Sequence, residues 1–347
     1  MVPSARADLV GQVGFDKQLF NPSQGESIVI RYELTQAAKV TLTLHDPDGR
    51  LIRTLVSGAS QPAGLQMATW DGKDDAGVVV PDEAYYPVLR VEGADGGSVT
   101  LDPSQDSGGE MLTGIEASYD AARGVVKYVL PESARVRVLA GIADGPLLAT
   151  VIPNLPRPAG LCEEPWNAMD DSGRIKVTER SGWQLRVEAF RLPRWAILAQ
   201  GNAGAKFTDY TLASMRKGGS EPPGHQLLAL ARKPRVVGSE RLSPFASQSR
   251  ILDQPPQFNV AVVGTKEAPE IEVALDPLTA SLLNEVRFEV VFYLDFKRMG
   301  EEEQAYSPMR FAVPTGSVAA GRHWLTVNVA SLTGQLGTQT LEIEIDK

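Results

Sequence analysis

Apolar and polar residues alternate in short runs through the first hundred residues of the chain. In the clearest run, 28–34, Ile28, Ile30 and Tyr32 fall on one face, while two charged residues and Val29 occupy the other. A period of two predicts a half-buried β-strand. Turns such as Asp46-Pro47-Asp48-Gly49 separate the runs, because proline fixes φ and glycine accepts a positive φ. The pattern predicts further short strands, and with them an antiparallel β-sandwich, at 40–44, 51–56, 65–70 and 85–91.

The chain contains this unit twice. An offset of 96 residues maps Trp70 onto Trp166, and the loop that follows each tryptophan is similar in both places. The same offset maps Tyr32 onto Tyr128 and Gly64 onto Gly160. A constant offset through special positions indicates a duplicated domain. We therefore expect an N-terminal tail at 1–11, a first Ig-like repeat at 12–105 and a second at 106–200.

A third sandwich is predicted at 257–347. Apolar residues alternate with polar ones through 271–275, 286–293 and 341–345. The segment between the second and third domains, 201–256, is punctuated by glycine and proline and predicts little regular structure. The expected fold class is all-β, with three Ig-like antiparallel β-sandwich domains in tandem and a long irregular connector before the third.

The first repeat carries a family resemblance. Phe20-Asn21-Pro22, Asp46-x-x-Gly49, Gly64 and the loop Trp70-Asp71-Gly72-x-Asp74-x-x-Gly77 together resemble the Ig-like domain of the flagellar hook-capping protein family. In the C-terminal part, 321–327 and 333–338 resemble the closing strand pair of bacterial Ig-like modules. The resemblance implies an Ig-like fold and use as a scaffold or outside the cytoplasm, and it implies no catalytic residues.

Composition narrows the classes of function. The 347 residues carry a net charge of -9 with a pI of about 5.1, which argues against nucleic-acid binding. The single cysteine, Cys162, excludes an internal disulfide, and no apolar run is long enough to span a membrane. Since no apolar segment follows Met1, we expect no signal peptide, which favours a membrane-peripheral location on the cytoplasmic face. The resemblance favours the alternative, a periplasmic or cell-surface location.

The connector is basic in an acidic chain. The stretch from Lys206 to Arg250 contains eight basic residues and three acidic ones, which gives it a net charge of +5. One interpretation is a solvated linker that neutralises the protein's own acidic domains. The other is an arm that binds an acidic partner protein or anionic lipid headgroups. The expected partner-binding residues of this arm are Lys206, Arg216, Lys217, Arg232, Lys233 and Arg235.

Three aromatic residues lie close together at the end of the second repeat. They are Trp183, Phe190 and Trp195. One interpretation is packing in the core and at the sheet edge. The other is an exposed docking patch, formed by Trp183 and Trp195, since tryptophan is favoured at the centres of interfaces.

A carboxylate cluster is the one candidate metal site. Asp71, Asp74 and Asp75 follow Trp70, and Asp46 and Asp48 lie in a neighbouring turn. Several carboxylate oxygens together suit calcium. Aspartates also cap turns by accepting hydrogen bonds from backbone amides, and this second interpretation requires no ion. We expect no bound cofactor.

The sequence offers no catalytic set. His45, His225 and His323 lie in three different modules, and no nucleophile elbow, phosphate-binding loop or Cys-x-x-Cys motif occurs. We therefore expect a non-enzymatic scaffold, a membrane-extrinsic accessory subunit whose partners are other subunits of a larger assembly, such as an energy-converting, photosynthetic or secretion complex. The alternative is a cell-surface adhesion or carbohydrate-binding protein that uses exposed tryptophans. An uncharacterised hydrolase ranks below both.

Overall fold

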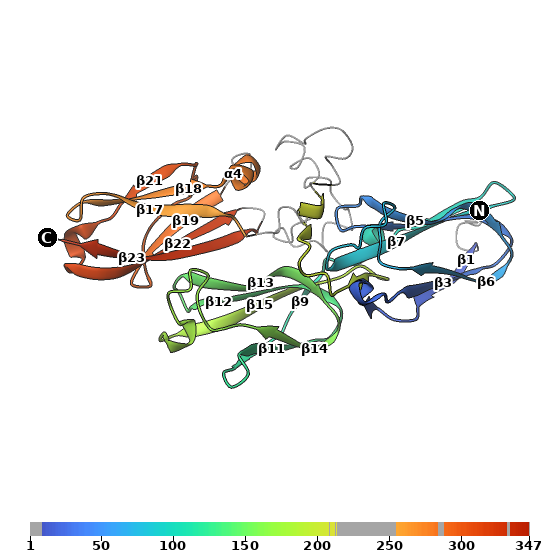
Figure 1. Ribbon diagram of the computed structural model, residues 1–347, viewed down its shortest axis with the longest axis horizontal. Helices are drawn as coiled ribbons and strands as arrows, with labels where there is room; N and C mark the ends of the chain where they lie inside the picture. The colour runs from blue at the N-terminus through green and yellow to red at the C-terminus, as the bar shows by residue number, and fades with distance from the viewer. Residues whose placement is uncertain are drawn as a thin grey trace, which may run out of the picture.

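Three β-sandwiches follow one another along the chain, and each packs a three-stranded sheet against a larger one (Figure 1). The structure, a computed structural model, describes residues 9–207, 209–211, 213, 255–283, 288–331 and 334–346. The prediction of an all-β fold built from Ig-like sandwiches is confirmed. The N-terminal tail is described only from Leu9 onward, and of the connector only 201–207, 209–211, 213 and 255–256 lie within the described residues.

The first domain buries the alternating side chains that its sequence predicts. Ile28, Ile30 and Tyr32 on one sheet are fully buried against Leu42 and Leu44 on the other. A short 3-10 helix, η1 (Pro22–Gln24), precedes this core, and a short helix, α1 (Pro103–Asp106), follows it. The smaller sheet has the order β1 (Val10–Phe15), β3 (Ile28–Leu34), β6 (Gly64–Trp70). The larger sheet has the order β5 (Leu51–Gln61), β4 (Ala38–His45), β7 (Glu83–Gly93), β16 (Ile197–Ala199), β2 (Leu19–Phe20), and β8 (Ser98–Leu101) also pairs with β7.

The second domain repeats this architecture. Tyr128, Leu130 and Val136 occupy the positions of Tyr32, Leu34 and Val40, and all six side chains are buried. The 3-10 helix η2 (Val177–Glu179) lies beside its core. The smaller sheet has the order β10 (Ala117–Asp120), β11 (Val125–Leu130), β14 (Gly160–Pro165), and the larger sheet β13 (Leu147–Arg157), β12 (Ala134–Ile142), β15 (Trp183–Arg191), β9 (Met111–Leu112).

The third domain is a sandwich of the same kind with its own core. Phe292 stacks on Phe311 at a centroid distance of 4.2 Å between its two sheets. It adds one helix that the sequence pattern did not predict, α4 (Pro277–Leu283), and a 3-10 turn, η3 (Thr315–Ser317). One sheet has the order β17 (Phe258–Gly264), β18 (Pro269–Leu275), β21 (Met309–Ala312), and the other β20 (Lys297–Glu302), β19 (Phe288–Leu294), β22 (Gly321–Ser331), β23 (Leu336–Ile345).

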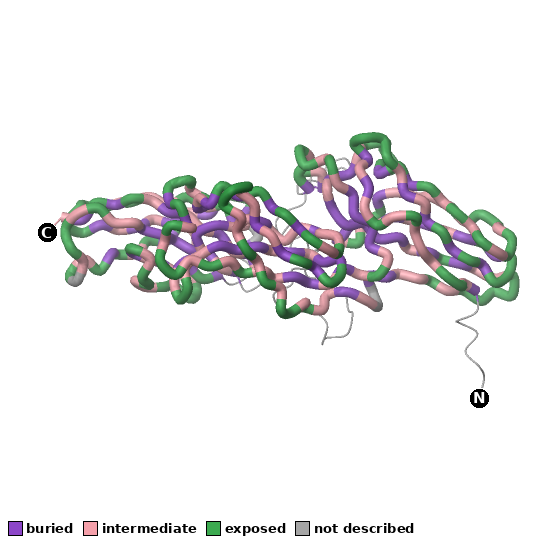
Figure 2. The backbone as a smooth tube through the Cα atoms, turned by 90° about the horizontal axis from the view of Figure 1, so that it is seen from below, coloured by how far each residue is buried: buried purple, intermediate pink, exposed green. Residues whose placement is uncertain are grey.

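Burial follows the sandwich layers in all three domains (Figure 2). Buried residues run along the inside of each sandwich, and exposed ones gather at the turns. In the first domain the two sheets bury every second residue of β3 and β4, as the period of two predicts. The apolar surface removed from water is the main stabilising contribution to such a fold.

The repeated tryptophans perform the same structural task. The indole Nε1 of Trp70 donates to the carbonyl oxygen of Lys73 at 2.9 Å, and Nε1 of Trp166 donates to that of Met169 at the same distance. Both rings are buried, and each holds its loop across the end of the sandwich. The aspartates that follow continue the match, because the amides of Asp75 and Asp171 donate to the equivalent strands β5 and β13.

One position in this loop is glycine in the first copy and alanine in the second, and its surroundings explain the difference. Gly72 has a φ of 70°, and a Cβ there would lie 2.3 Å from Cβ of Pro22. Glycine is therefore required in the first copy. Ala168 adopts a similar φ of 62° in the second copy, so its Cβ is accommodated there. The left-handed backbone costs an alanine about 1 kcal/mol, which the second copy tolerates.

Changing Trp70 to Phe tests this task. The substitution leaves the Lys73 carbonyl without its donor and removes part of a fully buried ring, so the first domain should lose about 2–3 kcal/mol of unfolding free energy. Denaturant titration monitored by circular dichroism measures the loss. Trp324→Phe is the matched control, because Trp324 is only partly buried and should lose less. Equal losses in the two variants would contradict the role given to Trp70.

Candidate interaction sites

One short strand joins the two repeats. β16 follows the last strand of the second domain along the chain, but it pairs antiparallel with β7 of the first domain, placing Ile197 opposite Tyr85. On its other side it pairs parallel with β2. The residues of β16 lie inside the range 106–200 predicted for the second repeat, yet their hydrogen bonds belong to the sheet of the first. Sequence periodicity identifies a strand but not the sheet that it joins.

A buried ion pair reinforces this junction. A guanidinium nitrogen of Arg135, on β12 of the second domain, lies 2.8 Å from a carboxylate oxygen of Glu83, on β7 of the first. The Glu83 side chain is fully buried and that of Arg135 is 12% exposed. A separate apolar cluster forms beside it from Ala84, Tyr86 and Leu198 with residues 192 and 196. A buried charge pair and shared apolar surface together favour one fixed arrangement of the two domains.

The two tryptophans of the proposed docking patch do not form one surface. Trp183 begins β15 and packs partly against the second core. Trp195 lies beyond the other end of that strand, in a turn with a φ of 59°, and Arg194 lies over its ring. Both side chains are partly buried, and Phe190, the third member, is 8% exposed. This geometry agrees with core and edge packing.

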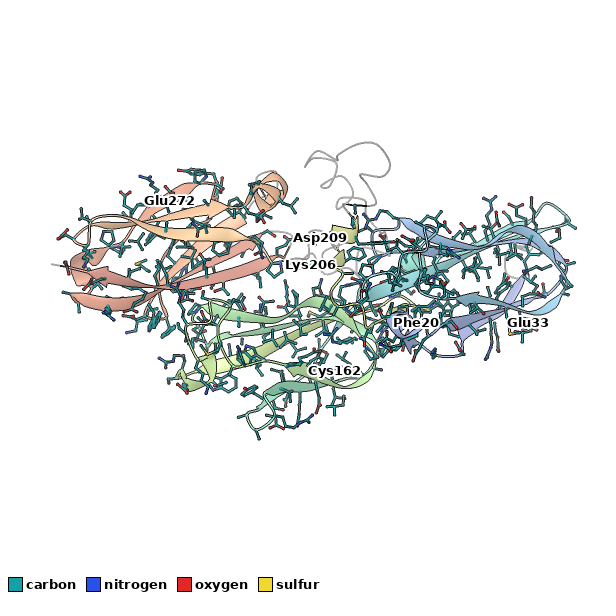
Figure 3. The ribbon with its side chains drawn as sticks, viewed as in Figure 1. Phe20, Glu33, Cys162, Lys206, Asp209 and Glu272 are labelled. Atoms are coloured by element: carbon teal, nitrogen blue, oxygen red, sulfur yellow. The ribbon has the colours of Figure 1, made fainter. Side chains whose placement is uncertain are left out.

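The connector is anchored to the first domain where it begins. Phe207 and Thr211 are buried, and Arg50 reaches both, donating to the Thr211 hydroxyl at 2.6 Å and lying over the Phe207 ring. The Tyr210 hydroxyl donates to Asp74 at 2.9 Å, and burial raises the pKa of this tyrosine. Figure 3 shows Lys206 and Asp209 at this anchor, and both are exposed.

Most of the predicted arm lies outside the described residues. Of its six expected partner-binding residues, Lys206 is described, and its side chain is exposed next to the anchor. The other five expected residues lie outside the described part of the chain: Arg216, Lys217, Arg232, Lys233 and Arg235. The remaining two basic residues of the arm, Arg241 and Arg250, lie outside it as well. Their binding to an acidic partner remains a prediction.

The candidate calcium ligands cap turns. Oδ1 of Asp74 accepts from the amides of Ala76 and Val78, and Asp71 accepts from that of Lys73. In the part of the chain that the structure describes, no three metal-ligating side chains converge on one point. The turn-capping interpretation therefore accounts for these residues, and three further aspartates have protein partners too: Asp46 and Asp48 with Arg50, and Asp75 with Thr54 and Arg53.

The junction between the second and third domains is built from backbone and amide groups. The side-chain amide of Asn328 donates to the carbonyl oxygen of Leu147 and accepts from its amide, both at 2.9 Å. The Thr338 hydroxyl donates to the same carbonyl oxygen at 2.7 Å. Asn328 thus binds Leu147 as a neighbouring strand would. Two hollows of about 340 and 620 Å³ flank this contact.

A groove of about 470 Å³ lies between the first and second domains. Polar side chains that line it form hydrogen bonds with neighbouring residues of the protein. Glu164 at its wall accepts two hydrogen bonds from Arg157 and one from Tyr128. Cys162 is buried there, and burial raises the pKa of its thiol, which disfavours the nucleophilic thiolate. No histidine lines this groove or either hollow.

The two described histidines have structural partners. His45 contacts the Thr43 hydroxyl at 2.9 Å, and His323 contacts Asp295 at 2.7 Å, which raises the pKa of His323. His225 lies outside the described residues. The acid, base and nucleophile of a hydrolase do not converge among the described side chains.

The family comparison concerns the first repeat. Residues 18–97 match the family model of the FlgD Ig-like domain, which confirms the resemblance noted in the sequence. The basal-body rod modification protein FlgD of Salmonella typhimurium is 43% identical over 67 residues, and that of Salmonella typhi matches equally. The match covers 19% of this chain and 28% of the length of these relatives. Ig-like domains are as a rule non-catalytic modules.

A comparison with solved structures gave matches of low overall similarity. The fibronectin(III)-like modules of Clostridium thermocellum CbhA cover 96% of this chain and 94% of their own, at 8% identity and a TM-score of 0.20. A tetra-tandem repeat from the extending region of a large adhesion protein covers 96% of this chain and 73% of its own, at 11% identity and a TM-score of 0.21. TM-scores this low carry no inference about function.

The described residues contain no helix long and apolar enough to cross a bilayer.

Replacing Arg135 by Leu tests the buried junction. The variant leaves the Glu83 carboxylate buried without its guanidinium partner, so we expect a loss of about 3 kcal/mol in unfolding free energy. The double variant Arg135→Leu, Glu83→Leu should recover much of this loss, because neither charge then remains buried. Calorimetric unfolding provides the measurement. A double variant that is less stable than Arg135→Leu would contradict the pairing.

Proposed function

We propose that this chain is a non-catalytic structural subunit that holds parts of a larger protein assembly together, as an accessory subunit extrinsic to a membrane. The observation that supports it best is the junction between the repeats. β16 pairs in the first domain's sheet, and the Glu83–Arg135 pair is buried between the domains. Two sandwiches fixed in this way form a rigid spacer, which suits a protein that sets the distance between partners.

The basic connector supplies the second element of the proposal. Its first basic residue, Lys206, lies beside a buried anchor on the first domain, so whatever the connector binds is held near a rigid body. Its net charge of +5 suits an acidic surface of a partner subunit. The carbohydrate-binding alternative is not proposed, because Trp183 and Trp195 lie at opposite ends of β15 and are partly buried.

Deleting the chain tests the scaffold role directly. The assembly that co-purifies with the native protein should lose subunits or dissociate in its absence, because their relative positions would no longer be fixed. Native gel electrophoresis and mass spectrometry of the purified assembly measure its composition. An assembly with unchanged composition and stability would refute the proposal.

Charge reversal tests the connector. Changing Arg232, Lys233 and Arg235 to Glu should weaken binding to the assembly about tenfold or more at low salt, with a smaller difference at high salt. The control reverses three exposed basic residues elsewhere, Lys176, Lys297 and Arg322, and should bind nearly as well as the parent. Equal weakening in both triple variants would attribute the effect to net charge and dismiss the arm.

A further inference from the structure

The outer edge of β15 is open where the equivalent edge in the first repeat is covered. In the first repeat β8 pairs with β7 through Leu89–Glu92. The offset of 96 residues maps that edge onto Leu185–Glu188 of β15. There β9 pairs only with Ala189 and Phe190, and no other described strand pairs with the edge.

The missing strand can be traced. The same offset maps β8 onto residues 194–197. In the second repeat this part of the chain turns away at Trp195 and forms β16 in the first domain's sheet. Of the segment that maps onto β8, only Ile197 belongs to β16, so the chain leaves the second sandwich where the first repeat forms β8. The edge of β15 is therefore left without an equivalent of β8 among the described strands.

The core beneath this edge is incompletely covered. Leu89 and Val91 in the first repeat are 4% and 0% exposed. Their counterparts Leu185 and Val187 are only partly buried, although both pack against the second core. In the first repeat the cover comes from β8, whose Val99 and Leu101 pack against the first core. The open edge thus leaves Leu185 and Val187 as a partly exposed apolar strip.

Backbone groups along the edge also point outward. The amide of Arg191 donates to Glu110, and its carbonyl oxygen accepts from Gly109, so both groups of Arg191 face away from β12. β15 pairs with β12 without a register shift, and the direction alternates along a strand. The amides and carbonyls of Val187 and Leu185 therefore face the same way, and no described strand pairs with them.

We propose that this edge, Leu185–Glu188, is a docking site for an extended segment of a partner protein. The segment adds an antiparallel strand to β15 and places aliphatic side chains at two alternate positions over Leu185 and Val187. β8 shows the chemistry required, with Val99 and Leu101 inward and Ser98 and Thr100 outward. Main-chain hydrogen bonds supply affinity and the apolar strip supplies specificity. The inference rests on the proposed scaffold function, since it names the site by which a partner is held.

A peptide with the sequence of residues 97–102 is the probe, because it carries the alternation of β8. Added in excess to the full-length protein, it should slow hydrogen exchange of the Leu185 and Val187 amides about tenfold or more. A peptide with Asp in place of both aliphatic residues should leave exchange unchanged. Failure of the first peptide to protect these amides would overturn the proposal without bearing on the composition of the assembly.

Two Leu→Asp variants locate the site. Leu185→Asp places a charge in the apolar strip and should abolish peptide protection. Leu161→Asp, on the exposed face of β14 in the same domain, is the matched control and should leave protection intact. Protection that survives in the first variant, or is lost in both, would contradict the assignment.

Proline substitution keeps the proposal testable if Leu185→Asp fails to fold. Val187→Pro removes an outward amide that no described strand pairs with, so it should block the peptide while lowering the melting temperature little. Val91→Pro removes the equivalent amide beneath β8 and should lower the melting temperature by several degrees more.

Two results without peptide would assign the edge to another occupant. Exchange at Leu185 and Val187 as slow as at Leu89 and Val91, in the monomer, would show that this chain covers its own edge. Self-association in sedimentation that Leu185→Asp abolishes would show that a second copy does. Either result would overturn the partner assignment.

Discussion

The hydrogen bonds between β16 and β7 are the constraint on which the arrangement of this protein depends. The edge of β7 is shared, with Leu89–Glu92 paired to β8 and Glu83–Tyr85 paired to β16. Since an unpaired edge exposes backbone donors and acceptors, β16 completes the first sheet. It does so with residues that follow the last strand of the second repeat along the chain. The two repeats are consequently one unit, and the second is left with an open edge.

Much of the fold could be predicted because it depends on local chemistry. The period of two identified β3 and β4, and the turn residues separated them from the strands that follow. The offset between Trp70 and Trp166 correctly indicated two equivalent loops, and the structure adds that each indole donates to the carbonyl oxygen three residues further on. The aspartates were predicted as turn caps or calcium ligands, and backbone amides near them favour the first interpretation.

The interaction sites were harder to predict because they depend on contacts between distant segments. Ile197–Ala199 is a short apolar run in the sequence, and nothing within it specifies that it pairs with a strand of another domain. Glu83 and Arg135 are ordinary charged residues in sequence, and only their burial makes them a junction. The loops after Trp70 and Trp166 are similar, and this similarity gave no sign that the chain after β15 takes a different course from the chain after β7. One signal was present, since residues 194–197 keep none of the β8 sequence.

Native-state hydrogen exchange at β16 tests the central claim most directly. Leu198 donates to Gln18 of the segment before β2, so alternation directs the Ile197 and Ala199 amides toward β7. If β16 is an integral strand of the first domain, these two amides should exchange with the same opening free energy as the core of β7. Rapid exchange at Ile197 and Ala199 while β7 stays protected would contradict the account.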